Sequence, residues 1–177
     1  APVRKALATS TIFNILGPLT NPAHVNYELL GCYDVNLLET LAKALKLTGV
    51  QRGMVINGNG MDEISIFGST KVSELLADGS IKNYELTNKD FGITGNYTQN
   101  DLLGGTPEEN AATARLILSG KGNDAHNAVI SANVSAMLHL AGKTESFKDG
   151  FEIAMDAVKS GHGIEKLDAI SKITSEA

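Results

Sequence analysis

Short apolar runs alternate with amphipathic segments along most of the chain, and this pattern is typical of an α/β protein. Residues 27–33 form an apolar run with the length of a strand, and residues 36–47 follow as an amphipathic helix. Residues 53–57 form a second apolar run. A strand, a helix and a strand joined by short connections predict a right-handed parallel crossover.

The pattern changes after residue 67. Residues 70–77 and 80–86 are two strand-like runs that flank Asp78-Gly79, which is a strong signal for a β-hairpin. These runs therefore predict an antiparallel edge of the sheet. Residues 87–105 are polar and rich in turn formers, so we expect a surface connection there, with a short helical turn at residues 99–103.

Four helices are expected after residue 105. Thr106, Pro107 and Glu109 form a capping box with proline in the first turn, which begins a helix that ends near Gly120. Residues 124–140 are rich in small side chains with helical periodicity, so this helix should pack closely against a sheet. Two amphipathic helices follow at residues 146–160 and 163–173. The fold class is therefore α/β, a mostly parallel central sheet with an antiparallel hairpin, flanked by helices.

The first 22 residues are less regular. Residues 4–7 read as the end of a helix, and residues 11–16 fit a strand or a helix equally well. The segment from Gly17 to Pro22 should end this element in an irregular loop, because proline lacks a backbone donor and restricts the residue before it.

Composition narrows the class of protein. The chain has 177 residues, 42% of them hydrophobic, which is enough for one sizeable core. The formal net charge is −5 and the lysines are scattered, so we expect no nucleic-acid partner. No apolar run approaches the roughly 20 residues of a membrane span, and no signal peptide is recognisable, so the cytoplasm is the expected location. Cys32 is the only cysteine and is predicted to lie in the core.

The most informative segment is residues 53–67, where an apolar strand is followed by a turn, an acid pair and a second apolar run, which is predicted to be another strand. Asn and Gly at positions 57–60 tolerate positive φ and favour a tight turn. Asp62 and Glu63 would then follow the carboxyl end of a parallel strand, where open α/β sheets bind ligands, and their oxygens suit Mg²⁺. The alternative is that Asp62 caps a turn and Glu63 is solvated.

Other chemistry is sparse. The four histidines lack zinc-ligand spacing, and the motifs of nucleophilic hydrolases and of mononucleotide and dinucleotide binding are absent from the sequence. The sequon at Asn133 falls within a helical pattern and is attributed to chance. The acid pair, the Arg4 cation and the Gly17-Pro18 segment together suit an anionic, metal-chelated small molecule. Without the other residues, Arg4 would be interpreted as a solvated cation at a helix end.

Four sequence runs occur in a fixed order: RKALATSTIFNILGPLTNPAH, GMDEIS, ELTNKDFGI and LLGGTPEENA. Together they resemble the anthranilate phosphoribosyltransferase family, from Arg4 to the last helix. The resemblance implies transfer of a phosphoribosyl group from phosphoribosyl pyrophosphate to anthranilate in tryptophan biosynthesis, with Mg²⁺ as cofactor. Residues 1–177 would form the family's C-terminal α/β domain, of the glycosyltransferase family 3 type.

The resemblance also implies what this chain lacks. The family has a preceding stretch with a helical domain, through which it forms homodimers, and a GTGGD loop that binds the diphosphate. We therefore expect this chain alone to be inactive. The related alternatives are a paralogue that binds nucleic acid without catalysis and a pyrimidine nucleoside phosphorylase.

Five site residues can be carried over from the family's motifs. Arg4 corresponds to the arginine that contacts the anthranilate carboxylate, and Gly17 and Pro18 would flank the aromatic acceptor. Asp62 and Glu63 correspond to the acid pair that binds the metal. The family often has glycine and arginine where this chain has Ala8 and Ser10, so Ser10 receives no role in binding phosphate.

Overall fold

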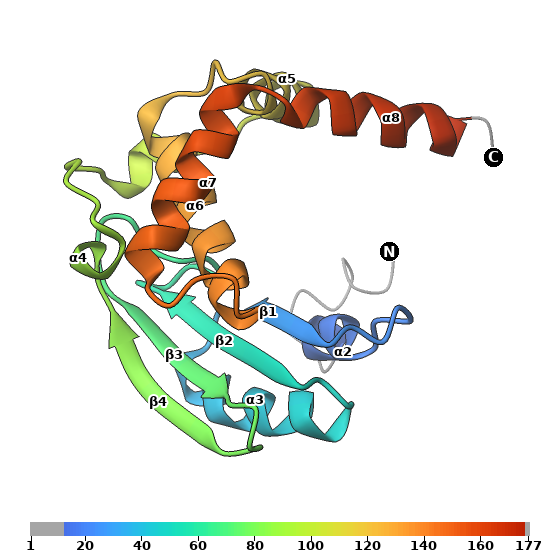
Figure 1. Ribbon diagram of the computed structural model, residues 1–177, viewed down its shortest axis with the longest axis vertical. Helices are drawn as coiled ribbons and strands as arrows, with labels where there is room; N and C mark the ends of the chain where they lie inside the picture. Colours follow the sequence, from blue (N-terminus) through green and yellow to red (C-terminus); the bar gives the residue numbers. More distant parts are fainter. Residues whose placement is uncertain (1–12, 176–177) are drawn as a thin grey trace.

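The computed structural model describes residues 13–175, and its centre is a four-stranded sheet in the order β1-β2-β3-β4 (Figure 1). The strands are β1 (Tyr27–Gly31), β2 (Arg52–Gly58), β3 (Thr70–Leu75) and β4 (Ile81–Leu86). β1 and β2 are parallel, and Tyr27 lies opposite Arg52. β2 pairs with β3, and β3 with β4, in antiparallel fashion.

The α/β class, the crossover and the hairpin are confirmed. One helix, α3 (Leu38–Leu47), connects the parallel pair, after a short 3-10 turn at Val35–Leu37. The expectation of a mostly parallel sheet is not met within the described residues, where one of the three pairings is parallel. The reason is that β2, β3 and β4 are joined by connections too short to cross over the sheet, so each strand returns beside its predecessor.

Helices cover both faces of the sheet (Figure 1). α3 packs on one face against β2 and β3, and α6 (Asp124–Leu140) packs on the other against β1 and β2. α7 (Phe147–Ser160) lies along α6, and α8 (Gly163–Ser175) contacts α5 (Pro107–Leu118) and α7. No helix in the described range 13–175 is long and apolar enough to cross a membrane.

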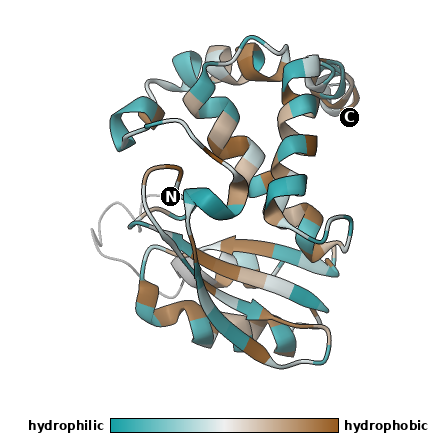
Figure 2. Cartoon of the chain, turned by 60° about the vertical axis from the view of Figure 1, so that its left-hand side comes forward, coloured by the Kyte–Doolittle hydropathy of each residue, from teal (hydrophilic) through white to brown (hydrophobic). Residues whose placement is uncertain are grey.

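The core has two parts because successive residues of a strand point to opposite faces. On β2, Met54 and Ile56 face α6, whereas Val55 faces α3. The α6 side is completed by a stripe of small residues, Ala125, Ala128, Ala132 and Ala136. The α3 side contains Leu38, Leu41, Ala42, Leu45 and the buried Cys32, as predicted. Figure 2 shows the hydrophobic residues concentrated in the central strands, while hydrophobic and hydrophilic residues alternate along the helices.

Two sequence predictions about local structure are wrong. The expected loop at Gly17-Pro18 is instead part of a helix, α2 (Phe13–Leu19), with Pro18 inside it. Pro18 lies in the last turn, where little helix remains to be broken, and the Thr20 hydroxyl donates to the Leu16 carbonyl at 2.9 Å. Loop residues 87–105 also contain a short helix that the sequence pattern did not predict, α4 (Asn88–Phe91), begun by a capping box at Thr87.

The second apolar run after the acid pair is not a strand. Ile64, Ser65 and Ile66 are almost fully buried, but they form no ladder with a neighbouring strand. Side chains satisfy the backbone instead, because the Ser65 amide donates to the Thr70 hydroxyl at 2.9 Å. Hydrophobicity therefore predicted the burial of this segment correctly but not its conformation.

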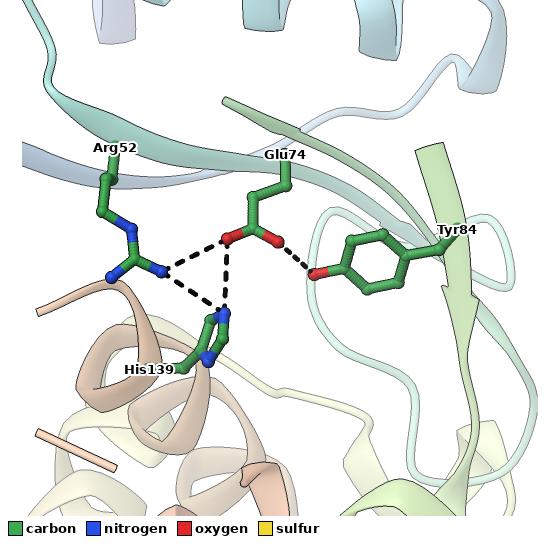
Figure 3. Close-up of polar contacts among 4 residues, drawn as sticks. All are labelled: Arg52, Glu74, Tyr84 and His139. Carbon is green, nitrogen blue, oxygen red and sulfur yellow. Dashed lines mark hydrogen bonds and ion pairs between the residues drawn. The ribbon is translucent and has the colours of Figure 1, made fainter. Parts of the chain in front are cut away.

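A buried charged network joins three strands to α6 (Figure 3). Glu74 on β3 accepts a hydrogen bond from the Tyr84 hydroxyl at 2.8 Å. Its other carboxylate oxygen lies 3.4 Å from Arg52 on β2 and 3.3 Å from His139 on α6. These residues all belong to the sheet face that α6 covers, and Glu74 retains only 4% of its side-chain exposure. The network therefore fixes the carboxyl-terminal half of α6 to the amino end of β2.

The surroundings of Glu74 determine its ionisation. Burial by itself would raise the pKa of Glu74, but hydrogen bonds from His139 and Tyr84 and the charges nearby outweigh it, so that the pKa is lowered. Burial raises the pKa of Tyr84, and the Glu74 charge adds to this effect. Glu74 is thus held as a carboxylate that accepts hydrogen bonds from its partners.

Replacing Glu74 with glutamine removes the charge that pairs with Arg52. We expect the Glu74→Gln variant to lose roughly 2–3 kcal/mol of unfolding free energy, less than a fully buried pair, because Arg52 and His139 keep 23% side-chain exposure. Equilibrium urea unfolding measures this loss. Glu85→Gln is the matched control, since Glu85 is an exposed glutamate on β4. Equal stability of wild type and Glu74→Gln would contradict the expectation.

The stabilisation from the Glu74 charge should depend on pH. Because the pKa of Glu74 is lower in the folded than in the unfolded protein, this stabilisation is complete above the ordinary value of 4.5. It is lost as the pH falls through the folded-state pKa. We therefore expect the stability difference between wild type and Glu74→Gln to narrow below pH 4.5 in urea unfolding. A difference that widens on acidification would contradict this assignment.

Candidate functional site

The chain turns sharply at the carboxyl end of β2. Gly58 and Met61 exchange two backbone hydrogen bonds, of 2.9 and 3.1 Å. The two residues between them, Asn59 and Gly60, have φ angles of 54° and 89°, as the sequence predicted for a tight turn. The Asn57 side chain stabilises this turn. Its amide oxygen accepts a hydrogen bond from the Gly60 amide at 3.1 Å, and its amide nitrogen donates to the Cys32 carbonyl at 2.8 Å.

The acid pair follows this turn and crosses the ends of both parallel strands. A Cβ atom at Gly31, the last residue of β1, would overlap the Asp62 carbonyl oxygen, and one at Gly58 would overlap the Glu63 carbonyl oxygen. The backbone of the acid pair therefore lies directly on two glycines. This placement confirms that Asp62 and Glu63 follow the carboxyl end of a strand in the crossover unit.

The two carboxylates have different surroundings. Glu63 accepts a hydrogen bond from Asn133 of α6 at 3.2 Å. The Asn133 side-chain oxygen accepts from the next amide, that of Ile64, at 3.3 Å. Among the described residues the Asp62 carboxylate has no hydrogen-bond partner, and the preceding turn is braced by Asn57, so the turn-capping alternative for Asp62 is wrong. Within residues 13–175, no side chain or backbone group occupies the hydrogen-bonding positions of the Asp62 carboxylate.

The electrostatics of the pair fit a cation. Desolvation by the surrounding protein raises the pKa of Glu63, and the neighbouring Asp62 charge adds to this effect. Both residues nevertheless remain exposed at the surface. Two adjacent carboxylates repel each other, and a cation bound beside them would offset this repulsion.

A cavity of about 260 Å³ opens beside the acid pair. It is lined by Met61, Asp62, Glu63, Leu102, His126 and Val129. Across residues 13–175, no group of three or more His, Cys, Asp or Glu side chains is arranged to hold a metal. The two carboxylates are donors of the kind that Mg²⁺ accepts, since this ion is typically bound by one or two carboxylates and takes its other ligands from water and phosphate.

Gly17 and Pro18, two other sequence-predicted site residues, lie away from the acid pair. Gly17 and Pro18 are exposed on α2, and Pro18 borders a second cavity, of about 320 Å³, with His24 and Glu28. This cavity also reaches Val25 and Val50, which precede β1 and β2, so it lies at the opposite end of these strands from the acid pair. Arg4 lies outside the described residues. Of the four predicted residues that the structure describes, the consecutive pair Asp62 and Glu63 lines one cavity, and Pro18 borders another.

Two further residues of this site were not identified from the sequence. Gly31 interrupts an apolar strand, and a glycine at such a position often marks a close backbone approach, which is a signal that could have found it. Asn133 was interpreted only as a chance sequon. It is 70 residues from Glu63 in the chain, and no local pattern indicates that the two meet.

Comparisons with known proteins identify the family to which the chain is similar. A sequence profile described as "Glycosyl transferase family, a/b domain" matches residues 1–164. The anthranilate phosphoribosyltransferase of Shewanella sp. (strain MR-4) is 44% identical over 176 residues, which cover 99% of this chain and 50% of that protein.

Solved structures are also similar. The anthranilate phosphoribosyltransferase (TrpD) of Thermus thermophilus has a TM-score of 0.84 and 37% identity, over 96% of this chain and 49% of that one. A variant of the Saccharomyces cerevisiae anthranilate phosphoribosyltransferase with Mg bound has a TM-score of 0.81 and 30% identity, over 94% and 48%. The chain spans about half the length of the curated relatives that it matches.

The acid pair at the end of β2, the mixed sheet covered by helices and the match over residues 1–164 lead to one assignment. The chain belongs to the glycosyl transferase family, and residues 1–164 correspond to its a/b domain.

Proposed function

We propose that this chain is part of an anthranilate phosphoribosyltransferase of tryptophan biosynthesis, which transfers the phosphoribosyl group of phosphoribosyl pyrophosphate to anthranilate and releases pyrophosphate. The observation that carries the proposal is the 44% identity over 99% of the chain to a relative of that name, together with an acid pair exposed at the end of β2. None of the relatives described above is named as a nucleic-acid binder or a nucleoside phosphorylase.

Asp62 and Glu63 would bind Mg²⁺ in this reaction. The yeast relative with Mg bound supports the choice of metal, and the chemistry of two exposed carboxylates agrees with it. When bound, the ion would neutralise negative charge on the departing pyrophosphate. Asp62, with no hydrogen-bond partner among the described residues, would remain open to the ion. The protein would then need no covalent nucleophile, because the anthranilate amine displaces pyrophosphate from the ribose directly.

The remaining assignments concern anthranilate. The Arg4 guanidinium would pair with its carboxylate, since a planar fork of donors matches a carboxylate well. The family motif would put Gly17 and Pro18 beside the aromatic ring, although the cavity that Pro18 borders lies at the opposite end of β1 and β2 from the acid pair. The diphosphate would be held by the glycine-rich loop of the family's preceding stretch, in a full-length enzyme that is a cytoplasmic homodimer.

Removing both carboxylates tests the metal assignment. In the full-length enzyme that contains this chain, we expect the Asp62→Ala/Glu63→Ala double variant to lose about 10²–10³-fold in turnover with Mg²⁺, the range for loss of preorganised electrostatic stabilisation. The measurement is the rate of phosphoribosylanthranilate formation. Asp156→Ala/Glu165→Ala is the matched control, because it removes the same two residue types from exposed helix positions. Full activity of the acid-pair variant, or no transfer by the wild-type enzyme, would refute the proposal.

Replacing Arg4 tests how the acceptor is bound. We expect Arg4→Ala to raise the KM for anthranilate about 10–100-fold, which corresponds to the ~1.5–3 kcal/mol of a hydrogen bond to a charged group. The KM for phosphoribosyl pyrophosphate should stay unchanged, because Arg4 would not touch that substrate. Arg4→Lys should recover part of the loss through its charge alone. Steady-state kinetics with each substrate varied in turn provide the values, and an unchanged KM for anthranilate would exclude this role.

A further inference from the structure

Asn133 on α6 makes three hydrogen bonds with its side-chain amide. Its nitrogen donates to the Glu63 carboxylate at 3.2 Å and to the Val129 carbonyl, one turn earlier in α6, at 2.9 Å. Its oxygen accepts from the Ile64 amide at 3.3 Å. The orientation of the amide is unambiguous, because two of these partners are acceptors and the third is a donor. Asn133 therefore joins α6 to two consecutive residues of the acid-pair segment.

Asn133 makes these contacts with the segment of residues 62–64, which already rests on the ends of β1 and β2. Ile64 is completely buried, and the backbone of Asp62 and Glu63 rests on Gly31 and Gly58. The segment is thus held between the sheet on one side and α6 on the other. Little freedom remains to Glu63 except rotation of its side chain.

The Asn133 amide restricts that remaining rotation. It binds Oε2 of Glu63, while Oε1 has no hydrogen-bond partner among the described residues. The bond to Val129 keeps the amide in place on its own helix, so Glu63 meets a donor that is already oriented. Packing of α6 would not require this bond, because the Ile64 and Val129 contacts alone satisfy both ends of the Asn133 amide.

We propose that Asn133 is a positioning residue that orients the Glu63 carboxylate so that its free oxygen can bind a divalent cation together with Asp62. The proposal rests on the metal assignment made under the proposed function. Hydrogen bonds of this kind from outside the ligand set are a general way to orient the carboxylates that bind metals. Such hydrogen bonds have the largest effect at a site with few protein ligands, because each ligand then contributes a large share of the affinity for the metal.

The test is Mn²⁺ binding to the full-length enzyme, measured from the electron paramagnetic resonance signal of free Mn²⁺ without substrates. Mn²⁺ prefers the same carboxylate oxygens as Mg²⁺. The Asn133→Leu variant keeps the branching of the side chain at Cγ, with a larger volume, and removes all three hydrogen bonds. We expect its Mn²⁺ dissociation constant to rise about 10–100-fold. In Asn133→Gln, which retains the amide, part of this loss should be recovered.

Asn127→Leu is the matched control. Asn127 is buried on the same helix and donates to the Gly122 carbonyl at 3.1 Å, away from the acid pair. This variant should lose thermal stability as Asn133→Leu does, but its Mn²⁺ affinity should stay near that of the wild type. In activity assays, Asn133→Leu should raise the Mg²⁺ concentration for half-maximal rate, with little change in kcat at saturating Mg²⁺. Should Asn133→Leu not fold, Asn133→Ser, whose hydroxyl is too short to reach Glu63, has the same expected result.

The possible failures can be told apart. If Glu63→Gln loses Mn²⁺ binding while Asn133→Leu and Asn133→Ser bind as the wild type does, the positioning role is wrong and the metal assignment stands. If Glu63→Gln and Asp62→Asn both bind Mn²⁺ as tightly as the wild type, the metal assignment itself is wrong, and the role of Asn133 falls with it. Weaker Mn²⁺ binding in Asn133→Leu and Asn127→Leu alike would also overturn the positioning role, because it would reflect a general loss of structure.

Discussion

The candidate site depends on a close contact between backbones, in which the acid pair lies against glycines at the ends of the two parallel strands. Any side chain at Gly31 or Gly58 would occupy the position of the Asp62 or Glu63 carbonyl oxygen. The contact allows the chain to cross both strand ends and to enter the core again at Ile64. The carboxylates consequently stand at the edge of the sheet, while the residue that follows them is anchored in its interior.

Helix α6 combines two properties that this arrangement needs. Its stripe of alanines lets it lie close to β1 and β2, since small side chains permit close approach of the backbones. A bulkier helix face would increase the distance between α6 and the acid-pair segment. With α6 this close, a side chain as short as that of Asn133 can reach Glu63 and Ile64.

Much of the fold could be predicted from the sequence, because local patterns determine it. The crossover from β1 to β2 followed from apolar runs on either side of an amphipathic helix, and the capping box at Thr106 marked the start of α5. The errors occurred where tertiary contacts replace local signals. Residues 64–67 have the hydrophobicity of a strand but obtain their backbone partners from side chains, and Pro18 is accommodated because its helix ends one residue later.

The candidate site also contains some residues that could be identified from the sequence and others that could not. Asp62 and Glu63 could be identified because they directly follow a strand and a turn, both visible in the sequence. The roles of Gly31 and Asn133 could not, since each acts on a residue far away in the chain, and only the packed structure brings them together. A single sequence describes each residue in its local context. The support for the candidate site comes from contacts between distant segments.

The charged network around Glu74, at the other end of the sheet, also helps to position α6. His139 and Asn133 are six residues apart on α6, about 9 Å along the helix at 1.5 Å per residue. Through His139, Glu74 fixes this part of α6 relative to β3. An α-helix held along one face transmits that position to its neighbouring turns, so the place of the Asn133 amide depends on the anchor that Glu74 provides. The Glu74 network therefore supports the position of Asn133, although it lies at the opposite ends of the parallel strands.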